Sequence, residues 1–434
     1  MRMVDLIEKK KLGGELSEEE IRFIVNGFTK GEIPDYQVSA FLMAVCFNHM
    51  TGDETFFLTD AMRKSGDVLD LSGISGVKVD KHSSGGVGDK TTLTLSPIVS
   101  SLGIPVAKMS GRGLGHTGGT IDKLESYPGF VTSIPEDRFI KQVNDIGICV
   151  AGQTKNLAPA DKKLYALRDI TATVAEPSLI ASSIMSKKLS SGADAIVLDV
   201  KVGDGAFMKT VEEARHLAGI MVKLGKDAGK KTTAVLTSME EPLGNAVGNI
   251  LEVREAYESL KGNGPKDFME VVYTLGTEML ILSGKYDTPE SAKAAMEEVV
   301  ENGSAAKKYE EWIIAQGGDP EIARDPEKFD HAKNALEIKA GQDGYVGSIK
   351  ASDVGHAVMS LGGGRATKDD VIDLTVGTVL QKKVGDNVSS EDTIAVLYGN
   401  DEEKMRAAAE EIRNSYKIVG DAVPAPELIL DIIR

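Results

Sequence analysis

Two glycine-rich loops carry the residue types that could bind a small ligand and act on it. The first reads KHSSGGVGDKTT at residues 81–92, and the second reads SGRGLGHTGGT at residues 110–120. Glycines let backbone N–H groups approach a ligand closely, lysines supply positive charge, and serines and threonines supply hydroxyl donors. A helix expected directly after the first loop would add its positive end. Together these groups suit a small oxyanion such as inorganic phosphate.

The known nucleotide-binding patterns do not match the first loop. The P-loop needs G-x-x-x-x-G-K-[ST], but Asp89 separates Gly88 from Lys90 here. The dinucleotide fingerprint fails as well, because no G-x-G-x-x-G opens the helix. The alternative is that both loops are glycine-rich connections without a ligand. We favour the anion site, since two loops of like chemistry on one sheet edge would be an uncommon coincidence.

The segments around the loops predict how the loops are positioned. Residues 77–80 and 104–109 have the character of strands, and residues 92–102 have the length and spacing of a helix. A right-handed crossover would make the two strands parallel, so that both loops follow strand C-termini and face one crevice. The apolar run 195–200 and the segment 232–236 predict further parallel strands.

Other regions depart from this α/β pattern. Residues 1–65 and 159–189 read as helices, the former with a capping box at Ser17 and Glu20. The apolar run 38–47 favours a subunit interface as well as a buried helix. From residue 334, short alternating segments separated by Gly and Asp predict a β-rich module. This module resembles the small sandwich of biotinyl and lipoyl carriers, but a counterpart of their modified lysine is missing, so a structural role is expected.

Composition limits the class of protein. A chain of 434 residues suits two or three domains. The formal net charge of −16 argues against nucleic acid as a partner, because phosphate backbones attract basic surfaces. Only Cys46 and Cys149 are present, which argues against a disulfide framework and favours a cytoplasmic protein. The N-terminus lacks a signal-peptide core, and no apolar run has the length of a membrane span, so no membrane partner is expected.

The motifs KHSSGGVGDKTT and SGRGLGHTGGTIDKLES, with the segment that carries Arg168, Ser183 and Lys187, give the chain a family resemblance. It resembles the pyrimidine-nucleoside phosphorylases, relatives of thymidine phosphorylase, over essentially its whole length. The resemblance implies an α/β fold: a small discontinuous helical domain, a large α/β domain with a mostly parallel central sheet, and a C-terminal β-rich, barrel-sandwich-like module. The expected boundaries are 1–69 with 155–192, then 70–154 with 193–332, then 333–434. A homodimer built through the helical domain is also implied.

Residue by residue, the resemblance implies three sets of ligands. The phosphate site would comprise Lys81, His82, Ser83, Thr92, Lys108, Ser110 and Thr120. The pyrimidine base would be held by Tyr165, Arg168, Ser183 and Lys187, with His82 at the base carbonyl or the sugar. A potassium-type cation would be held by the carbonyl groups of Gly88, Lys90, Leu243 and Ala246 and by the Glu255 carboxylate. No organic cofactor is implied.

Two positions depart from the family pattern. The usual S-T-G-G is S-S-G-G at residues 83–86, which keeps a hydroxyl at Ser84. The usual K-T-G-A-G-A-F-M is K-V-G-D-G-A-F-M at residues 201–208. Asp204 therefore adds a negative charge, which would alter turnover if that loop closes over the site.

The activity implied is reversible phosphorolysis of a pyrimidine nucleoside to free base and α-pentose 1-phosphate. Phosphate would attack the anomeric carbon through an oxocarbenium-like transition state, with no protein nucleophile. Arg168 and Lys187 would stabilise negative charge on the departing base. His82 would protonate a base oxygen or, alternatively, orient Lys81, and His116 is expected to stabilise its loop.

Substrate range is inferred from one position. Thymidine-restricted members of the family have an uncharged residue where this chain has Lys108. We therefore expect phosphorolysis of uridine, thymidine and deoxyuridine. The alternatives are a thymidine-restricted phosphorylase, a phosphoribosyltransferase, and a noncatalytic nucleoside- or phosphate-binding protein. The phosphoribosyltransferase would favour an acidic metal motif, and the two loop regions offer only Asp89 and Asp122.

Overall fold

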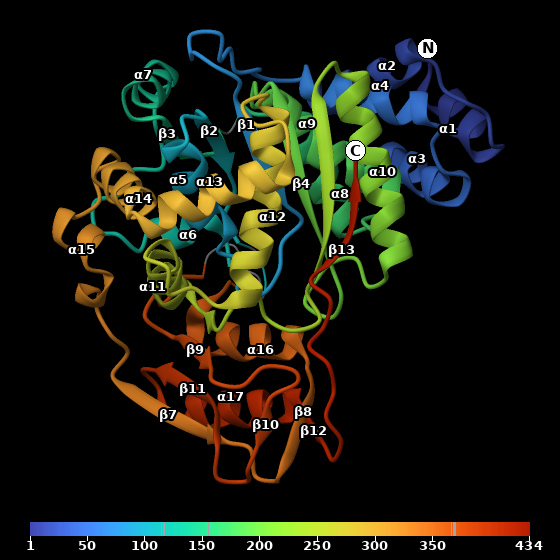
Figure 1. Cartoon of the computed structure of the whole chain (residues 1–434). Coiled ribbons are helices and arrows are strands. Elements are labelled where there is room, and N and C mark those ends of the chain that lie inside the picture. The colour runs from blue at the N-terminus through green and yellow to red at the C-terminus, as the bar shows by residue number, and fades with distance from the viewer. Residues whose placement is uncertain (114, 116–117, 155, 366, 368–369) are drawn as a thin grey trace.

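A computed structural model describes residues 1–113, 115, 118–154, 156–365, 367 and 370–434. A helical lobe lies beside a sheet covered by helices, and a β-rich module lies at one end of the α/β part (Figure 1). This arrangement confirms the predicted fold class. Within the described ranges, no helix is both long and apolar enough to cross a membrane.

The helical lobe is built from two separate stretches of chain. The first forms α1 (Met3–Lys11), α2 (Glu18–Lys30), α3 (Asp35–Asn48) and α4 (Gly52–Arg63), and the second forms α8 (Pro159–Asp169) and α9 (Pro177–Ser190). Both stretches contribute to one apolar core, where Leu164 and Leu179 belong to the same cluster as Phe28 and Phe41. The predicted capping box opens α2, with Ser17 and Glu20 each accepting from the other's backbone N–H. Burial of this shared core makes the lobe one unit.

The central sheet has the strand order β1-β4-β5-β13. β1 (Val79–Ser83), β4 (Ala195–Val202) and β5 (Lys231–Ser238) are parallel, and β13 (Ile429–Ile433) pairs antiparallel with β5 at the edge. The strands predicted at 195–200 and 232–236 are confirmed. β13 has no counterpart among the predicted strands.

The first crossover differs from the prediction in one respect. α5 (Thr91–Ser101) connects β1 to β2 (Val106–Ser110) as expected, but β2 pairs with β3 (Ile148–Gly152) in a separate parallel sheet. The Lys108 side chain lies between β1 and β2: its Nζ donates to the Lys81 carbonyl and lies 3.1 Å from Asp80 Oδ1. The contact between β1 and β2 thus includes a buried ion pair and a side-chain hydrogen bond, and the two strands belong to different sheets.

Helices cover both faces of the central sheet. α10 (Val211–Asp227) packs with α9, β4 and β5, while α5 and α12 (Lys266–Leu282) pack on the opposite face. The remaining helices of the α/β part are α6 (Thr120–Leu124), α7 (Glu136–Ile146), α11 (Asn249–Leu260), α13 (Pro289–Glu301), α14 (Ser304–Ala315), α15 (Pro320–Arg324) and the 3-10 turn η1 (Pro326–Lys328).

The C-terminal module contains two small antiparallel sheets. The first, in the order β6-β9-β11-β7, consists of β6 (Ala246–Val247), β9 (Gly377–Leu380), β11 (Thr393–Gly399) and β7 (Asn334–Lys339). The second, in the order β10-β8-β12, consists of β10 (Asn387–Val388), β8 (Gly344–Ile349) and β12 (Tyr416–Val419). The helices are α16 (Ala351–Val358), the π turn η2 (Met359–Gly363) and α17 (Glu402–Ser415).

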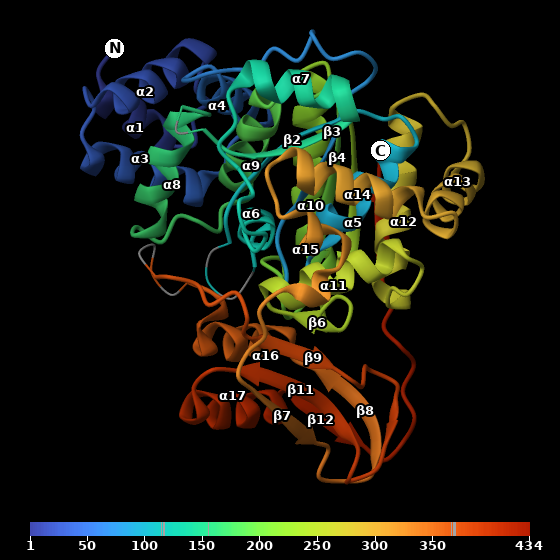
Figure 2. The ribbon, with the colours of Figure 1, turned by 90° about the vertical axis from the view of Figure 1, so that its left-hand side faces the viewer.

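The module is joined to the α/β part by backbone pairing. β6 comes from the α/β part of the chain but pairs with β9 of the module. In the second view, β6 and α11 lie directly above β9 and α16 (Figure 2). The boundaries 1–69 with 155–192, 70–154 with 193–332, and 333–434 remain our proposal, except that β13 pairs with β5 in the central sheet and so does not belong to the module.

Candidate active site

A pocket of about 330 Å³ lies between the two glycine-rich loops. Its lining includes most of the predicted phosphate ligands, namely His82, Ser83, Thr92, Lys108, Ser110 and Thr120. The loops therefore face one crevice as predicted, although β1 and β2 belong to different sheets. Backbone from both loops completes the wall at Gly85, Gly86, Gly118 and Gly119. His116 and Thr117 lie outside the described residues.

Lys81 is the member of the predicted phosphate set that does not line this pocket. Its Nζ lies 3.1 Å from Asp199 Oδ2 and donates to the Thr91 hydroxyl. Burial opposes the charged form, but the carboxylates of Asp89 and Asp199 outweigh burial and raise the pKa of Lys81. In this arrangement the Lys81 ammonium group supports the first loop through Thr91, on the side away from the pocket. Contact between Lys81 and phosphate remains a prediction.

Asp80 holds two lysines at the base of the pocket. Its two carboxylate oxygens lie 3.1 Å from Lys108 Nζ and 2.9 Å from Lys188 Nζ. Burial raises the pKa of Asp80, but both ammonium groups outweigh burial and bring that pKa to about 2. Burial and the nearby Lys188 and Lys81 lower the pKa of Lys108 to about 8, although Asp80 opposes the shift. Lys108 is therefore positively charged at neutral pH and could attract an anion.

Sequence reasoning missed Asp80 and Lys188. Each is adjacent in sequence to a predicted site residue, Lys81 or Lys187. For Asp80 that adjacency was a usable signal, because successive residues of a strand point to opposite faces, whereas Lys188 lies beside Lys187 on α9 and lines the same pocket.

A second pocket of about 390 Å³ adjoins the first and contains all the predicted base ligands, Tyr165, Arg168, Ser183 and Lys187. Its apolar wall is formed by Val174, Ile180, Ile184, Phe207, Met208 and Leu217. A flat, partly apolar ring with polar edges would match this lining.

Backbone carbonyls orient the Arg168 guanidinium. Its nitrogens donate to the carbonyl oxygens of Thr173 at 3.2 Å, Leu179 at 3.1 Å and Val174 at 2.7 Å. Burial lowers the pKa of Arg168, although Asp161 opposes the shift. Because guanidinium has five N–H donors, it keeps donors for a ligand after these bonds are made.

Lys187 and His82 line both pockets. Lys187 Nζ lies 2.7 Å from Asp161 Oδ2 and 3.3 Å from Ser183 Oγ, so α8 and α9 together fix its position. Burial, with Lys188 and Lys108 nearby, lowers the pKa of His82 well below its ordinary value. His82 is therefore neutral at pH 7 and can donate one N–H. For His82 to protonate a nucleobase, a bound ligand would have to raise the pKa of His82.

The predicted cation ligands come together, but they do not fit a potassium ion. The Lys90 ammonium group lies among them, within 3.1 Å of the carbonyl oxygens of Gly88, Leu243 and Ala246. Glu255 Oε2 lies 2.6 Å from the same nitrogen. Four of the five oxygens expected to bind a metal ion are thus paired with the Lys90 side chain, and the fifth, the Lys90 carbonyl, accepts from the Leu93 N–H.

Asp204 is engaged away from both pockets. Its Oδ2 accepts from the Ser352 N–H at 2.8 Å and the Ser352 hydroxyl at 2.6 Å, at the start of α16. The departure from the family pattern thus anchors the loop after β4 to the C-terminal module, where a carboxylate also favours the helix N-terminus.

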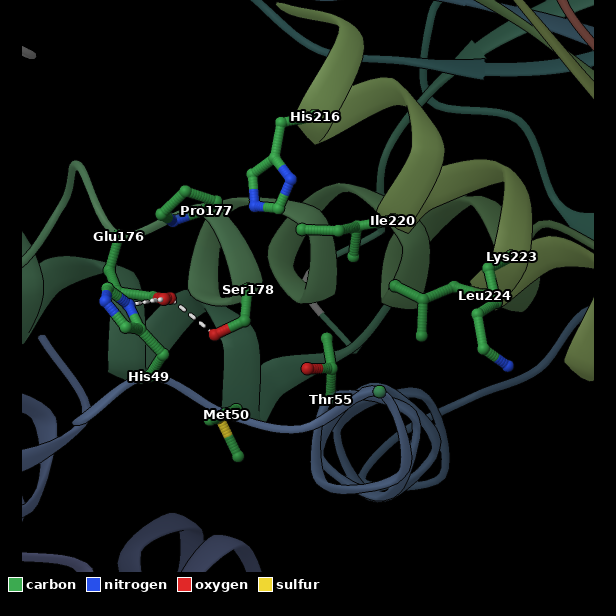
Figure 3. Close-up of a pocket in the computed structure, with 11 residues that line it drawn as sticks. His49, Met50, Thr55, Glu176, Pro177, Ser178, His216, Ile220, Lys223 and Leu224 are labelled. Carbon is green, nitrogen blue, oxygen red and sulfur yellow. Dashed lines mark hydrogen bonds and ion pairs between the residues drawn. The ribbon is translucent and has the colours of Figure 1, made fainter. Parts of the chain in front are cut away.

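A separate pocket of about 450 Å³ lies at the other end of α9 (Figure 3). It shares no residue with the two pockets above. Its buried carboxylate, Glu176, accepts from the Leu179 N–H at 2.8 Å and the Ser178 hydroxyl at 2.5 Å, and His49 Nδ1 lies 3.4 Å away. These partners assign Glu176 to capping α9, whose following turns carry Ser183 and Lys187.

Three family models match successive segments of the chain. The model described as "Glycosyl transferase family, helical bundle domain" matches residues 4–66 and "Glycosyl transferase family, a/b domain" matches residues 75–306. "Pyrimidine nucleoside phosphorylase C-terminal domain" matches residues 345–419.

Full-length relatives and a solved structure extend this result. Pyrimidine-nucleoside phosphorylase of Geobacillus stearothermophilus is 55% identical over 431 residues, 99% of both chains, and that of Bacillus subtilis (strain 168) is 54% identical over 433 residues, 100% of both. The crystal structure of anthranilate phosphoribosyltransferase from Thermus thermophilus shares the fold, with a TM-score of 0.58 at 18% identity over 71% of this chain and 98% of that one. The chain belongs to the pyrimidine-nucleoside phosphorylase family.

Proposed function

We propose that this protein catalyses the reversible phosphorolysis of pyrimidine nucleosides. Uridine, thymidine and deoxyuridine would give the free base and α-ribose or α-deoxyribose 1-phosphate. The observation that carries the proposal is the pair of adjoining pockets, one polar and glycine-lined, the other partly apolar, with Lys187 and His82 on both. Such a pair can hold an anion and a nucleoside base side by side, which supplies the proximity that a displacement needs.

Each step of the proposed reaction is assigned to residues that line the two pockets. Lys108 and the loop N–H groups attract and orient phosphate for attack on the anomeric carbon. Arg168 and Lys187 stabilise the negative charge that grows on the base as the glycosidic bond breaks. Neutral His82 donates a hydrogen bond at the junction of the pockets. Phosphate is a co-substrate, and no organic cofactor takes part.

The phosphoribosyltransferase alternative is disfavoured by the state of the acidic residues. The Asp89 carboxylate accepts from the hydroxyls of Ser83 and Thr91, each at 2.5 Å. Asp122 pairs with Arg365 at 2.9 Å and with Arg112 at 3.2 Å. Both carboxylates are thus already occupied by hydroxyl or guanidinium donors, which leaves no acidic pair free for a metal-bound pyrophosphate among these two residues.

The test is release of free base. Purified protein, uridine and inorganic phosphate should yield uracil and ribose 1-phosphate in equal amounts, with none formed when phosphate is omitted. Absence of product from every pyrimidine nucleoside would contradict the proposal and favour a noncatalytic binding protein. Turnover of thymidine without turnover of uridine would support the thymidine-restricted alternative.

The proposed working form is a cytoplasmic homodimer. α3 carries apolar side chains on more than one face, and its buried face includes Val38 and Val45. On its other face Tyr36 and Phe47 are 74% and 77% exposed. Large aromatic side chains left in solvent favour contact with a second copy of the chain.

A further inference from the structure

The ammonium group of Lys90 lies at the centre of the expected cation site. Its Nζ is 2.8 Å from the Leu243 carbonyl oxygen, 2.9 Å from that of Gly88 and 3.1 Å from that of Ala246. Glu255 Oε2 is 2.6 Å away, and Lys90 is only 1% exposed. Carbonyl oxygens of this kind are the groups that replace the hydration shell of a potassium ion. Here they surround a charge that the chain supplies itself.

The remaining oxygens of this site are committed elsewhere. The Lys90 carbonyl oxygen, the fifth expected ligand, accepts from the Leu93 N–H at 3.0 Å in the first turn of α5. Glu255 Oε1 accepts from the N–H groups of Asn245 and Ala246, both at 3.0 Å. A potassium ion would therefore have to share oxygens that already have donors.

Charge balance also argues against a further ion. One carboxylate, Glu255, faces one ammonium group, Lys90, and the pair is neutral. A metal ion at the same oxygens would place a second positive charge beside Lys90 with no second carboxylate within the ion pair. Uncompensated charge in a buried site is strongly unfavourable.

The surrounding backbone holds the ammonium group in place. A Cβ at Gly244 would lie 3.0 Å from Lys90 Nζ and 2.5 Å from Glu255 Oε2, and a Cβ at Gly88 would lie 2.6 Å from the Leu243 oxygen. Both glycines have positive φ, 68° and 72° respectively. Phe268 closes another side, with its ring centroid 5.2 Å from the nitrogen. The backbone thus closes tightly around a group of this size.

We propose that Lys90 is a built-in replacement for the monovalent cation, so that this protein neither requires nor binds potassium at this position. Lys90 is a positioning residue. It ends the loop in which Ser83, Gly85 and Asp89 line the phosphate pocket, and it fixes that loop to residues 243–246.

A second lysine holds the same segment from the C-terminal module. Lys383 Nζ lies 3.0 Å from the Gly244 carbonyl oxygen and 3.0 Å from Asp267 Oδ2. The segment is therefore held on two sides by ammonium groups that are covalently part of the chain. This arrangement gives the phosphate loop a support that does not vary with the salt of the solution.

The experiment is a cation titration of the wild type and two variants. Tm and the KM for phosphate are measured in choline chloride and, at equal ionic strength, in increasing potassium chloride, so that charge screening stays constant. Lys90→Ala leaves the carbonyl oxygens and Glu255 free for an ion. Lys90→Met keeps most of the side-chain volume without the charge, so it is the matched control.

Wild-type Tm and KM should not change with potassium. Lys90→Ala should have a lower Tm and a higher phosphate KM in choline, and potassium should restore both along a saturable curve. Lys90→Met should be destabilised without restoration. A saturable potassium effect on the wild type would overturn the proposal, as would a folded Lys90→Ala that ignores potassium. If neither variant folds, the wild-type titration decides, and because Tm needs no turnover, the answer is independent of the proposed function.

Discussion

At the scale of single residues, Lys187 connects the two halves of the site, because it lines both pockets. Lys187→Ala should lower kcat/KM for uridine by roughly a hundredfold or more, since preorganised charge at a departing group contributes on this scale. Steady-state kinetics measure the loss at a temperature at which the variant is folded, because the buried Asp161 carboxylate loses its partner at 2.7 Å and Tm should fall. Lys162→Ala, which removes an exposed lysine of α8, is the control. A near-normal rate in Lys187→Ala would exclude a catalytic role.

Lys108 gives a second residue-scale prediction, a pH dependence of phosphate binding. Its pKa of about 8 means that the ammonium form is lost as the pH rises through 8. The Kd for phosphate, measured by calorimetry without nucleoside, should therefore increase above pH 8, by up to about tenfold per pH unit. Lys108→Met should bind phosphate weakly and without this dependence. A wild-type Kd that stays constant to pH 10 would show that Lys108 does not interact with the anion.

Most of the predicted site residues line the two pockets, but the sequence did not give the directions of their side chains. Ser183 and Lys187 share a helix face by spacing alone, and the structure brings them together with Arg168. Lys81 and Lys90 were expected to present an ammonium group and a carbonyl oxygen, respectively, to ligands. Lys81 instead pairs with Asp199, and Lys90 supplies its ammonium group. Such directions depend on partners that are distant in sequence, so spacing within one motif cannot give them.

At the scale of elements, α9 positions Ser183 and Lys187 in the proposed base pocket, and its first turn is held by a side-chain cap. Glu176 accepts from the Leu179 N–H, and the Leu179 carbonyl accepts from Arg168. Glu176→Ala should lower the free energy of unfolding by about 1 kcal/mol and raise the KM for nucleoside, because the first turn of α9 loses its anchor.

The matched control for this variant is another helix cap. Thr288 caps α13 through the Ser291 N–H, away from both pockets. Thr288→Ala should lose similar stability in urea denaturation but keep its KM. Equal KM values for Glu176→Ala and the wild type would limit Glu176 to a stabilising role.

The strands of the α/β part differ in how far the sequence predicts them. The strands predicted at 195–200 and 232–236 correspond to β4 and β5, because fully buried parallel strands give continuous apolar runs. The assignment of β1 and β2 to one sheet was wrong: β2 pairs with β3, and the contact between β1 and β2 includes the buried Asp80–Lys108 ion pair. Strand pairing is decided by such long-range contacts, which a local pattern does not contain.

At the scale of the whole molecule, the exposed aromatic side chains of α3 lead to a prediction about assembly. Phe47→Glu should convert the proposed homodimer to a monomer, because a carboxylate would be buried without a partner at the contact. Sedimentation velocity measures the change, with circular dichroism to verify folding. Val371→Glu, at a position 94% exposed on the C-terminal module, is the control and should stay dimeric. A wild type that sediments as a monomer would contradict the proposal.

The three-part architecture was largely predictable, because composition and periodicity change clearly between its parts. The edge strand β13 could not be predicted in the same way. Ile429–Ile433 is a short, mostly apolar segment, and its partner strand β5 lies far away in sequence. Its position matters for the molecule, because it returns the chain from the module to the central sheet.

The module is therefore an insertion rather than an appendage. The chain enters it before β7 and leaves it after β12 to complete the central sheet with β13, while β6 pairs with β9 from the other side. Large chains with separate domains often melt in several steps. Here neither part can come apart without disrupting hydrogen bonds of the other, so calorimetry should record one shared endotherm for both. Two resolved endotherms would mean that the module and the α/β part unfold independently despite the pairing of β13 and β6.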